Sequence, residues 1–258
     1  MRVQRLAPGR SLQATYPCAT ESPPPFWADG LSLSRAWFAH ELGRSVEGFH
    51  LLNERDEVIG HIYWAPSEHA LVPYRMEAGI AYEYCEWIQR EWQGQGGMQR
   101  LFEAFVRYLR REGYKGILVD GTDYEGYMHY SHFLKRGFRI LREQNGGHLL
   151  YYPLSQDEVR VEPIPAKLPE TCRTGICIFG SQFCPVGASA VLYVRRAVQD
   201  LGGRVPLTET PATRDTVERY GIADGIYLKG KPAFFGPVTE QQVRRQIEEE
   251  FGLTSAPG

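Results

Sequence analysis

A glycine cluster separates a strand-type segment from a strong helical pattern, and this junction constrains the fold more than any other part of the chain. Residues 79–88 read GIAYEYCEWI, which is typical of a strand. Residues 96–113 place apolar side chains three and four positions apart, as in a helix that packs one face on a sheet. Gly94, Gly96 and Gly97 lie between the two patterns. A strand joined so closely to a helix indicates an α/β fold.

The same loop is suited to bind an anion. The first turn of a helix has backbone N–H groups without intrahelical partners, and the positive end of the helix dipole lies behind them. Glycines would let a pyrophosphate approach these groups closely. A tight turn without a ligand explains the three glycines equally well. A Walker loop needs Gly-Lys-Ser/Thr after the turn, and a dinucleotide fingerprint needs its third glycine deeper in the helix and an acidic ribose ligand after the next strand. Neither pattern is complete in this chain.

Composition limits the kinds of partner. The chain has 258 residues, of which 43% are hydrophobic, so it can form two modest domains with sizeable cores. A net charge of −2 without a long run of Lys or Arg argues against nucleic acid or an anionic membrane surface as a partner. No apolar run approaches the ~20 residues that span a bilayer, and the first residues lack an apolar signal core. We therefore expect a cytoplasmic protein that binds a small molecule or another protein.

Four prolines mark the clearest domain boundary. Pro153, Pro163, Pro165 and Pro169 interrupt any helix or central strand. We therefore predict a first domain over residues 1–154 with a core from about residue 30, a linker over 155–170 and a second domain over 171–258.

The first domain is predicted to contain one mixed sheet with flanking helices. A helix is expected over 31–44, with Ser32 or Ser34 as N-cap. A hairpin is expected from 49–52 and 57–65, with its turn at 53–56. The remaining expected elements are strands at 79–88, 116–121, 138–141 and 147–153 and helices at 96–113 and 125–136.

The second domain is predicted to alternate strands and helices. Strands are expected at 175–180 and 204–210, a hairpin at 225–236, and helices at 185–202, 213–221 and 239–252. This order resembles a thioredoxin fold, in which Cys184 would occupy the place of the nucleophilic thiol. Gly187 stands where the second cysteine is usual, and Asp224 and Gly225 stand where a proline is usual. A redox cycle with two thiols therefore cannot run within this motif.

The segment QGQGGM, residues 93–98, resembles the Arg/Gln-x-x-Gly-x-Gly/Ala loop of the GNAT acetyltransferases. The resemblance covers about a hundred residues, because HFLKRGF at 132–138 and the order of elements also match. Met98 departs from the family pattern, which has a small residue there. WAPSEHALVPYR, YCEWIQREWQGQGG and FCPVGAS are similar to a narrower group, the bacterial acetyltransferases with a YoaP-like C-terminal domain.

This resemblance implies an N-acetyltransferase that uses acetyl-CoA as co-substrate and transfers the acetyl group directly to a small amine or amino-acid-like acceptor. Backbone groups near Trp87 and Ile88 would bind the pantetheine arm. The pyrophosphate would be bound by the loop, whose residues are Gln93, Gly94, Gln95, Gly96, Gly97 and Met98. Two alternatives are a non-catalytic CoA- or protein-binding module with a vestigial loop, and a thiol-redox protein that works through Cys184.

Two carboxylates are candidates for the general base that such a reaction needs. Glu83 and Glu86 lie in an otherwise apolar strand, and their separation of three predicts that they face opposite sides of the sheet. A half-buried carboxylate would have a raised pKa and could accept a proton. Glu86 is preferred because it lies closer to the loop. An exposed or salt-bridged strand residue is an equally good interpretation of either position.

The general acid is less well marked. By resemblance, a tyrosine is common at the position of Phe133, which cannot donate a proton. Tyr130 and His132 are neighbours that could replace it, and Tyr130 lies one helical turn from Phe133. Water could also protonate a thiolate whose pKa is about 8.5.

Histidines and cysteines do not predict a metal site. His129 and His132 have helical spacing, but no matching pair of ligands supports them. The five cysteines are scattered and odd in number, so we expect reduced thiols.

Overall fold

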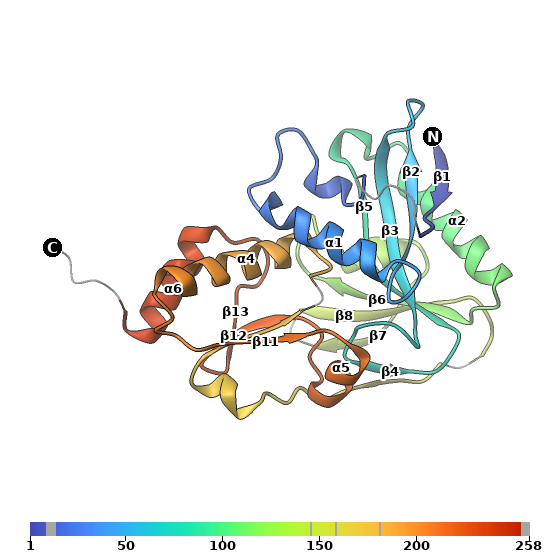
Figure 1. The fold of residues 1–258 in the computed structure, drawn as a ribbon. Helices are drawn as coiled ribbons and strands as arrows, with labels where there is room; N and C mark the ends of the chain where they lie inside the picture. The colour runs from blue at the N-terminus through green and yellow to red at the C-terminus, as the bar shows by residue number, and fades with distance from the viewer. Residues whose placement is uncertain (9–13, 145, 158, 181, 254–258) are drawn as a thin grey trace. The chain divides into compact units, whose positions relative to one another are not determined.

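The computed structural model describes residues 1–8, 14–144, 146–157, 159–180 and 182–253, and these form two compact units. The units interleave along the chain, which Figure 1 colours from its first to its last residue. The first unit contains Met1–Cys18, Glu41–Ala70 and Arg75–Glu162, and the second contains Ala19–His40, Leu71–Tyr74 and Pro163–Gly258. The predicted domain limits follow the order of the sequence and stay a prediction.

A seven-stranded mixed sheet forms the centre of the first unit, as predicted. Its strand order is β1-β2-β3-β5-β6-β8-β7. Only the pair β5 and β6 is parallel within the described ladders, and the other neighbours are antiparallel. The strands are β1 (Arg2–Arg5), β2 (Glu47–Leu52), β3 (Val58–Pro66), β5 (Ile80–Ile88), β6 (Gly116–Thr122), β7 (Arg139–Gln144) and β8 (Gly147–Pro153). The sequence analysis did not predict β1.

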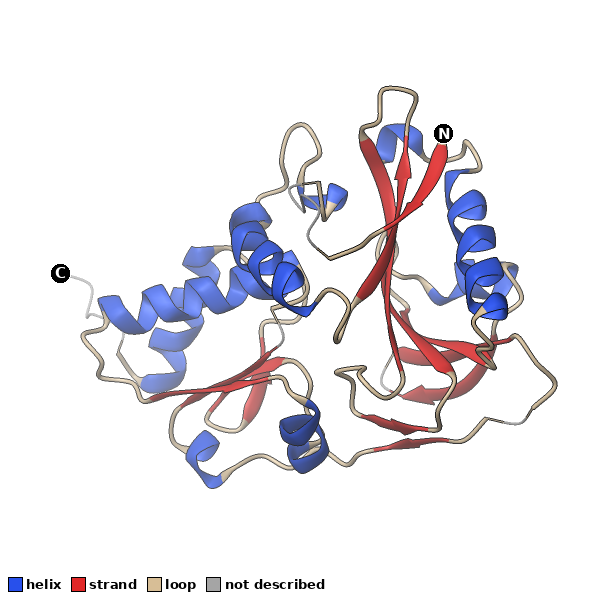
Figure 2. Cartoon of the chain, turned by 45° about the vertical axis from the view of Figure 1, so that its right-hand side comes forward, coloured by secondary structure: helices blue, strands red, loops and turns tan. Residues whose placement is uncertain are grey.

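Two helices cover one face of this sheet. Helix α2 (Gly97–Arg111) contacts β2, β3 and β5 and is seen beside the sheet in Figure 2. It buries the apolar positions that its sequence pattern predicted, namely Leu101, Phe102, Phe105, Val106 and Leu109. Helix α3 (Tyr130–Lys135) contacts β6, β7 and β8.

Helix α3 begins five residues later than the predicted helix at 125–136. Gly126 and Met128 have positive φ values of 87° and 46°, which a right-handed helix cannot include. The Thr122 hydroxyl instead donates to the Tyr127 carbonyl at 2.6 Å and stabilises a turn. His129 caps the helix by accepting the Ser131 N–H at its Nδ1 atom.

The second unit has a four-stranded sheet of order β11-β10-β12-β13. β10 is parallel to β11 and antiparallel to β12, and α4 packs against α6. The strands are β10 (Ile176–Gly180), β11 (Leu207–Pro211), β12 (Gly225–Leu228) and β13 (Lys231–Ala233). The helices are α1 (Leu31–Glu41), α4 (Pro185–Asp200), α5 (Arg214–Tyr220) and α6 (Glu240–Phe251). Each of these elements was predicted from the sequence.

The 3₁₀ turn that precedes α1, η2 (Ala28–Gly30), packs against α4 in the second unit. The Gly30 N–H donates to the Ser189 hydroxyl at 2.7 Å, and the Tyr193 hydroxyl donates to Asp29 at 2.9 Å. A Cβ atom at Gly30 would lie 2.4 Å from the Ser189 nitrogen, so only glycine permits this approach. Because η2 leads directly into α1, Ser32 and Ser34 lie inside the helix, and the predicted N-cap is wrong.

A disulfide joins Cys172 to Cys177, with Cα atoms 5.3 Å apart. Cys172 lies in the 3₁₀ turn η4 (Glu170–Arg173). This turn packs against β10, which contains Cys177. The expectation of reduced thiols is therefore wrong for these two residues. Cys18, Cys85 and Cys184 are outside any disulfide.

Several short elements complete the chain. β4 (Tyr74–Met76) pairs with β9 (Val161–Pro163), which lies in the predicted linker. Two further 3₁₀ turns are η1 (Pro17–Ala19) and η3 (Arg90–Trp92). Within the ranges that the structure describes, no helix has both the length and the apolar character to cross a membrane. The cytoplasmic location stays a prediction.

Candidate active site

The glycine loop between β5 and α2 has two kinds of glycine. Gly94 and Gly96 have φ values of +75° and +76°, and a Cβ atom at either would meet no atom within 4 Å. Gly97 is buried, and its Cβ would lie 2.9 Å from Cδ2 of Leu51. Gly94 and Gly96 are therefore required by the backbone conformation and border open space, whereas Gly97 lets α2 approach the sheet.

The amino end of α2 has the features of an anion site. Gly96 is its N-cap, no side chain caps the first turn, and no acidic residue lies in that turn. The side-chain amides of Gln93 and Gln95 donate to the carbonyls of Ile88 and Glu91 at 3.0 and 2.9 Å, which braces the loop. Met98 is half-buried against the core of the first unit. The first-turn N–H groups are thus available to an anion.

A groove of about 1000 Å³ opens beside this loop. Its lining includes residues of β1, Trp92, and Gly96, Gln99 and Arg100 of the loop and α2. The loop therefore borders a space large enough for part of a ligand.

β5 and β6 diverge in the middle of the sheet. β5 pairs with β6 only from Ile80 to Glu83, while it continues along β3 as far as Ile88. β6 continues along β8 as far as Thr122. Residues 84–88, which include Trp87 and Ile88, are therefore not paired with β6. Residues 84–88 are called the splayed part of this strand below.

A β-bulge places Glu83 and Glu86 on the same face of the sheet. Glu83 is opposite Trp64 and Glu86 is opposite Ile62, and the register shifts between these two pairs. Trp64 and Ile62 are two residues apart on β3 and both belong to the core beneath α2. The predicted opposite orientation of the two carboxylates is therefore wrong, because the extra residue at Tyr84 resets the alternation of side chains.

The Glu83 carboxylate lies at the point of divergence and is buried, with 1% of the residue exposed. Neither of its oxygens accepts a hydrogen bond from the described residues. Burial raises the pKa of Glu83 well above 4.5, and the negative charge of Glu86 raises it further, whereas Arg136 opposes this shift. Glu83 therefore keeps its proton to a higher pH than an exposed carboxyl group does.

Glu86 is held in a two-pronged ion pair with Arg136. The two guanidinium Nη atoms donate to the two carboxylate oxygens at 2.6 and 2.5 Å. The guanidinium also lies 4.7 Å from the ring centre of Phe133 and 4.9 Å from that of Phe102. The sequence analysis did not predict Arg136 as a site residue. Its place between Phe133 and Phe138 was the available signal, because a cation among buried rings needs a buried partner. Both carboxylate oxygens of Glu86 therefore already accept hydrogen bonds from Arg136.

Tyr130 and His132 each contact a histidine ring. The Tyr130 ring stacks on His148, with ring centres 4.2 Å apart. His132 is exposed, and its ring meets His129 edge-on at 6.0 Å. Phe133 is fully buried and packs edge-on against Phe138. Among the described residues, no hydrogen bond joins Tyr130 or His132 to Glu83 or Glu86.

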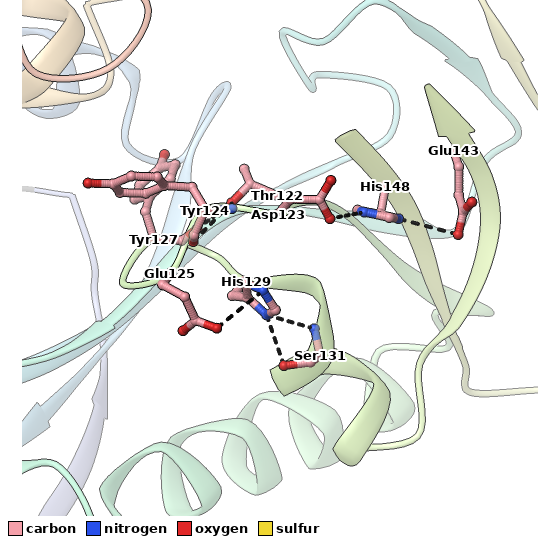
Figure 3. Close-up of polar contacts among 9 residues, drawn as sticks. All are labelled: Thr122, Asp123, Tyr124, Glu125, Tyr127, His129, Ser131, Glu143 and His148. Carbon is pink, nitrogen blue, oxygen red and sulfur yellow. Dashed lines mark hydrogen bonds and ion pairs between the residues drawn. The ribbon is translucent and has the colours of Figure 1, made fainter. Parts of the chain in front are cut away.

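Polar contacts fix the loop between β6 and α3 (Figure 3). Asp123 Oδ1 lies 2.7 Å from His148 Nε2, and Glu143 Oε1 lies 3.5 Å from His148 Nδ1. His129 Nδ1 is 2.9 Å from the Ser131 hydroxyl. These contacts anchor the start of the helix that precedes Arg136. In the described part of the chain, no three His, Cys, Asp or Glu residues are grouped so as to bind a metal ion.

Cys184 is the N-cap of α4 in the second unit and is followed by Pro185. Gly187 and Gly180 both face Asp224, since a Cβ atom at either would lie 3.4 or 3.2 Å from its carboxylate oxygens. Gly187 therefore leaves room for the Asp224 carboxylate. Cys172 and Cys177 are bonded to each other, so neither is a free thiol that could resolve a disulfide formed at Cys184.

Comparison with known proteins identifies the class of the first part of the chain. Residues 12–138 match the model of the "Acetyltransferase (GNAT) family". The resemblance stated from the glycine loop is therefore confirmed for residues 12–138, which match a GNAT acetyltransferase domain. No curated protein matches the sequence.

Similar solved structures include three acetyltransferases. A putative acetyltransferase of the GNAT family from Desulfovibrio desulfuricans is 13% identical, with a TM-score of 0.47 over 60% of this chain and 99% of that one. YhbS from Escherichia coli in complex with CoA is 13% identical, with a TM-score of 0.44 over 60% of this chain and 82% of that one. The PaiA N-acetyltransferase from Thermoplasma acidophilum in complex with coenzyme A is 12% identical, with a TM-score of 0.45 over 59% and 99%.

Proposed function

We propose that this protein is an acetyl-CoA-dependent N-acetyltransferase that transfers an acetyl group directly to a small amine or amino-acid-like acceptor. The observation that carries the proposal is the buried Glu83 carboxylate, which has no hydrogen-bond partner among the described residues and lies where β5 leaves β6. The GNAT match over residues 12–138 supports the reaction class.

Acetyl-CoA binding would use the glycine loop and the splayed strand. The pyrophosphate would accept hydrogen bonds from the backbone N–H groups at the start of α2. These groups lie next to Gly94 and Gly96, which border open space. The pantetheine arm would lie along residues 84–88, near Trp87 and Ile88, where β5 is not paired with β6. An N–H group of this segment would donate to the thioester oxygen as negative charge develops on it.

Glu83 is the preferred general base, in place of Glu86. It would take a proton from the acceptor ammonium, and the neutral amine would then attack the thioester carbon. As the C–N bond forms and the C–S bond breaks, the nitrogen loses its second proton, which passes through water to the departing CoA thiolate. Glu86 is less suited to this role because Arg136 binds both of its oxygens. Tyr130 and His132 remain alternative proton donors.

The test compares Glu83→Gln with Glu86→Gln and with Glu112→Gln, an exposed control at the end of α2. We expect Glu83→Gln to lower kcat about 10²-fold or more with little change in acetyl-CoA affinity. Release of CoA thiol and mass spectrometry of products from an amine panel measure turnover. Wild-type turnover by Glu83→Gln would remove Glu83 from the mechanism. CoA binding without turnover by the wild type would instead favour a binding module.

The second unit is proposed to be a thioredoxin-like, YoaP-like accessory domain that helps select the acceptor. The order of its elements and the position of Cys184 before α4 support this assignment. The arrangement of Gly187 beside Asp224 and the Cys172–Cys177 disulfide argue against a two-thiol redox cycle at Cys184.

A further inference from the structure

We propose that Arg136 is a positioning residue of the transfer site: by holding Glu86 in a two-pronged pair, it balances the charge beside Glu83 and so sets the pH range in which Glu83 accepts a proton. This inference rests on the proposed function, because it assigns Glu83 the role of base. It assigns a role in the site to Arg136, which lies outside the glycine loop and the splayed strand.

The position of Arg136 is fixed by more than its carboxylate partner. Its guanidinium lies over the rings of Phe133, Phe102 and Phe138, at 4.7, 4.9 and 5.9 Å. These rings come from α3, α2 and the start of the segment that leads into β7. The Arg136 side chain is only 16% exposed. A planar cation can stack on rings and bind both oxygens of one carboxylate, which a lysine cannot do as well.

The bulge in β5 brings this pair into the surroundings of Glu83. Because Glu83 and Glu86 share one face, the Glu86 charge acts directly on Glu83. The neighbouring core is apolar and comes from β3, α2 and β6, with Ile62, Trp64, Phe102, Phe105 and Val119 among its members. Among the described residues, the charged groups that act on Glu83 are Glu86 from its own strand and Arg136 from the end of α3.

Charge counting then gives the sign of each perturbation. In the wild type, the −1 of Glu86 raises the pKa of Glu83 and the +1 of Arg136 opposes this increase. Loss of the cation leaves the Glu86 charge uncompensated, so Glu83 should hold its proton to higher pH. Loss of the Glu86 charge leaves a cation beside Glu83, so Glu83 should ionise at lower pH. Loss of both charges should restore the balance.

The experiment measures kcat/KM against pH for Arg136→Met, Glu86→Gln and the double variant. We expect the acid limb to move up by at least about one pH unit in Arg136→Met and down in Glu86→Gln. The double variant should return the limb to within about half a unit of the wild type. A merely structural role would lower the rate in all three without moving the limb in opposite directions. That result would overturn the inference.

A second measurement covers the case in which Arg136→Met does not fold, since it leaves a buried unpaired charge. The double variant is neutral at both positions and keeps the comparison open. Carboxyl carbon-13 NMR of glutamate-labelled protein would follow Glu83 directly, with Glu83→Gln assigning its signal. An unmoved Glu83 titration in a folded variant overturns the inference. Opposite shifts without any amine acetylation by the wild type would support the charge balance and reject the proposed function.

Discussion

Acidification below pH 6.5 should destabilise the first unit through His50 of β2. His50 is 5% exposed, and its Nε2 atom lies 3.0 Å from the Tyr63 hydroxyl. Burial lowers the pKa of His50 from 6.5 to about 4. The folded protein therefore keeps this imidazole neutral at pH values where the unfolded chain protonates it.

The size of the effect follows from this difference in pKa. Between pH 6.5 and 4 the unfolded state binds more protons at His50 than the folded state, so stability falls as the pH falls. Each pKa unit corresponds to about 1.4 kcal/mol, and the interval from 6.5 to about 4 therefore corresponds to about 3 kcal/mol. His61 acts in the same direction, because burial lowers its pKa well below 6.5 and neither of its ring nitrogens has a partner among the described residues.

Hydrogen exchange followed by mass spectrometry measures the opening free energy of the intact protein separately for peptides from β2 and β3. The contribution of His50 to the opening free energy, taken as the difference between the wild type and His50→Gln, should fall by about 3 kcal/mol between pH 6.5 and 4. His50→Gln should show a flatter dependence on pH, because glutamine does not titrate. His69→Gln, at an exposed position after β3, is the control and should keep the wild-type dependence.

One outcome would refute this reasoning. A difference between the wild type and His50→Gln that does not change from pH 6.5 to 4 would mean that His50 titrates equally in the folded and unfolded states. The remaining pH dependence belongs to other groups, among them Glu83 of β5, whose raised pKa acts in the opposite direction.

Two glycine substitutions test the loop and the packing of η2 on α4. Gly96→Asp should abolish CoA binding in calorimetry, because it adds negative charge where the pyrophosphate should lie. Gly113→Asp is the matched control. Gly113 also has a positive φ and borders open space, but it lies beyond the other end of α2. Unchanged CoA affinity in Gly96→Asp would remove the loop from the site. Gly30→Ala should lower the free energy of unfolding of the second unit by about 2 kcal/mol or more, because its Cβ would meet the α4 backbone at 2.4 Å, and equal denaturation midpoints would contradict this packing.

Local sequence signals were sufficient for most elements and for the glycine loop. The helical spacing of apolar residues predicted α2, and the turn residues between apolar runs predicted the hairpin of β2 and β3. Signals failed where tertiary contacts decide the outcome. β1 is four residues long and owes its place to pairing with β2, and β4 and β9 are each three residues long. Such short strands have no periodicity of their own.

The candidate site shows the same limit. A strand pattern with strict alternation separates Glu83 from Glu86, and one bulged residue reverses that conclusion. No composition signal in YEYCEWI announces the bulge, because it depends on the register with β3. Arg136 could not be paired with Glu86 from the sequence, since fifty positions separate them and α3 must first place the guanidinium. The disulfide similarly depends on how η4 packs on β10.

The placement of Ala19–His40 in the second unit has a consequence for synthesis of the protein. Gly30 and its partner Ser189 are 159 positions apart, and Gly30 lies inside the stretch that matches the acetyltransferase family. At 5–20 residues per second, a ribosome needs roughly 10–30 s to make the chain between them. During that interval η2 has no partner, because α4 has not been made. The nascent chain should therefore present η2 and the helix α1 that follows it to chaperones before the remainder of their unit exists.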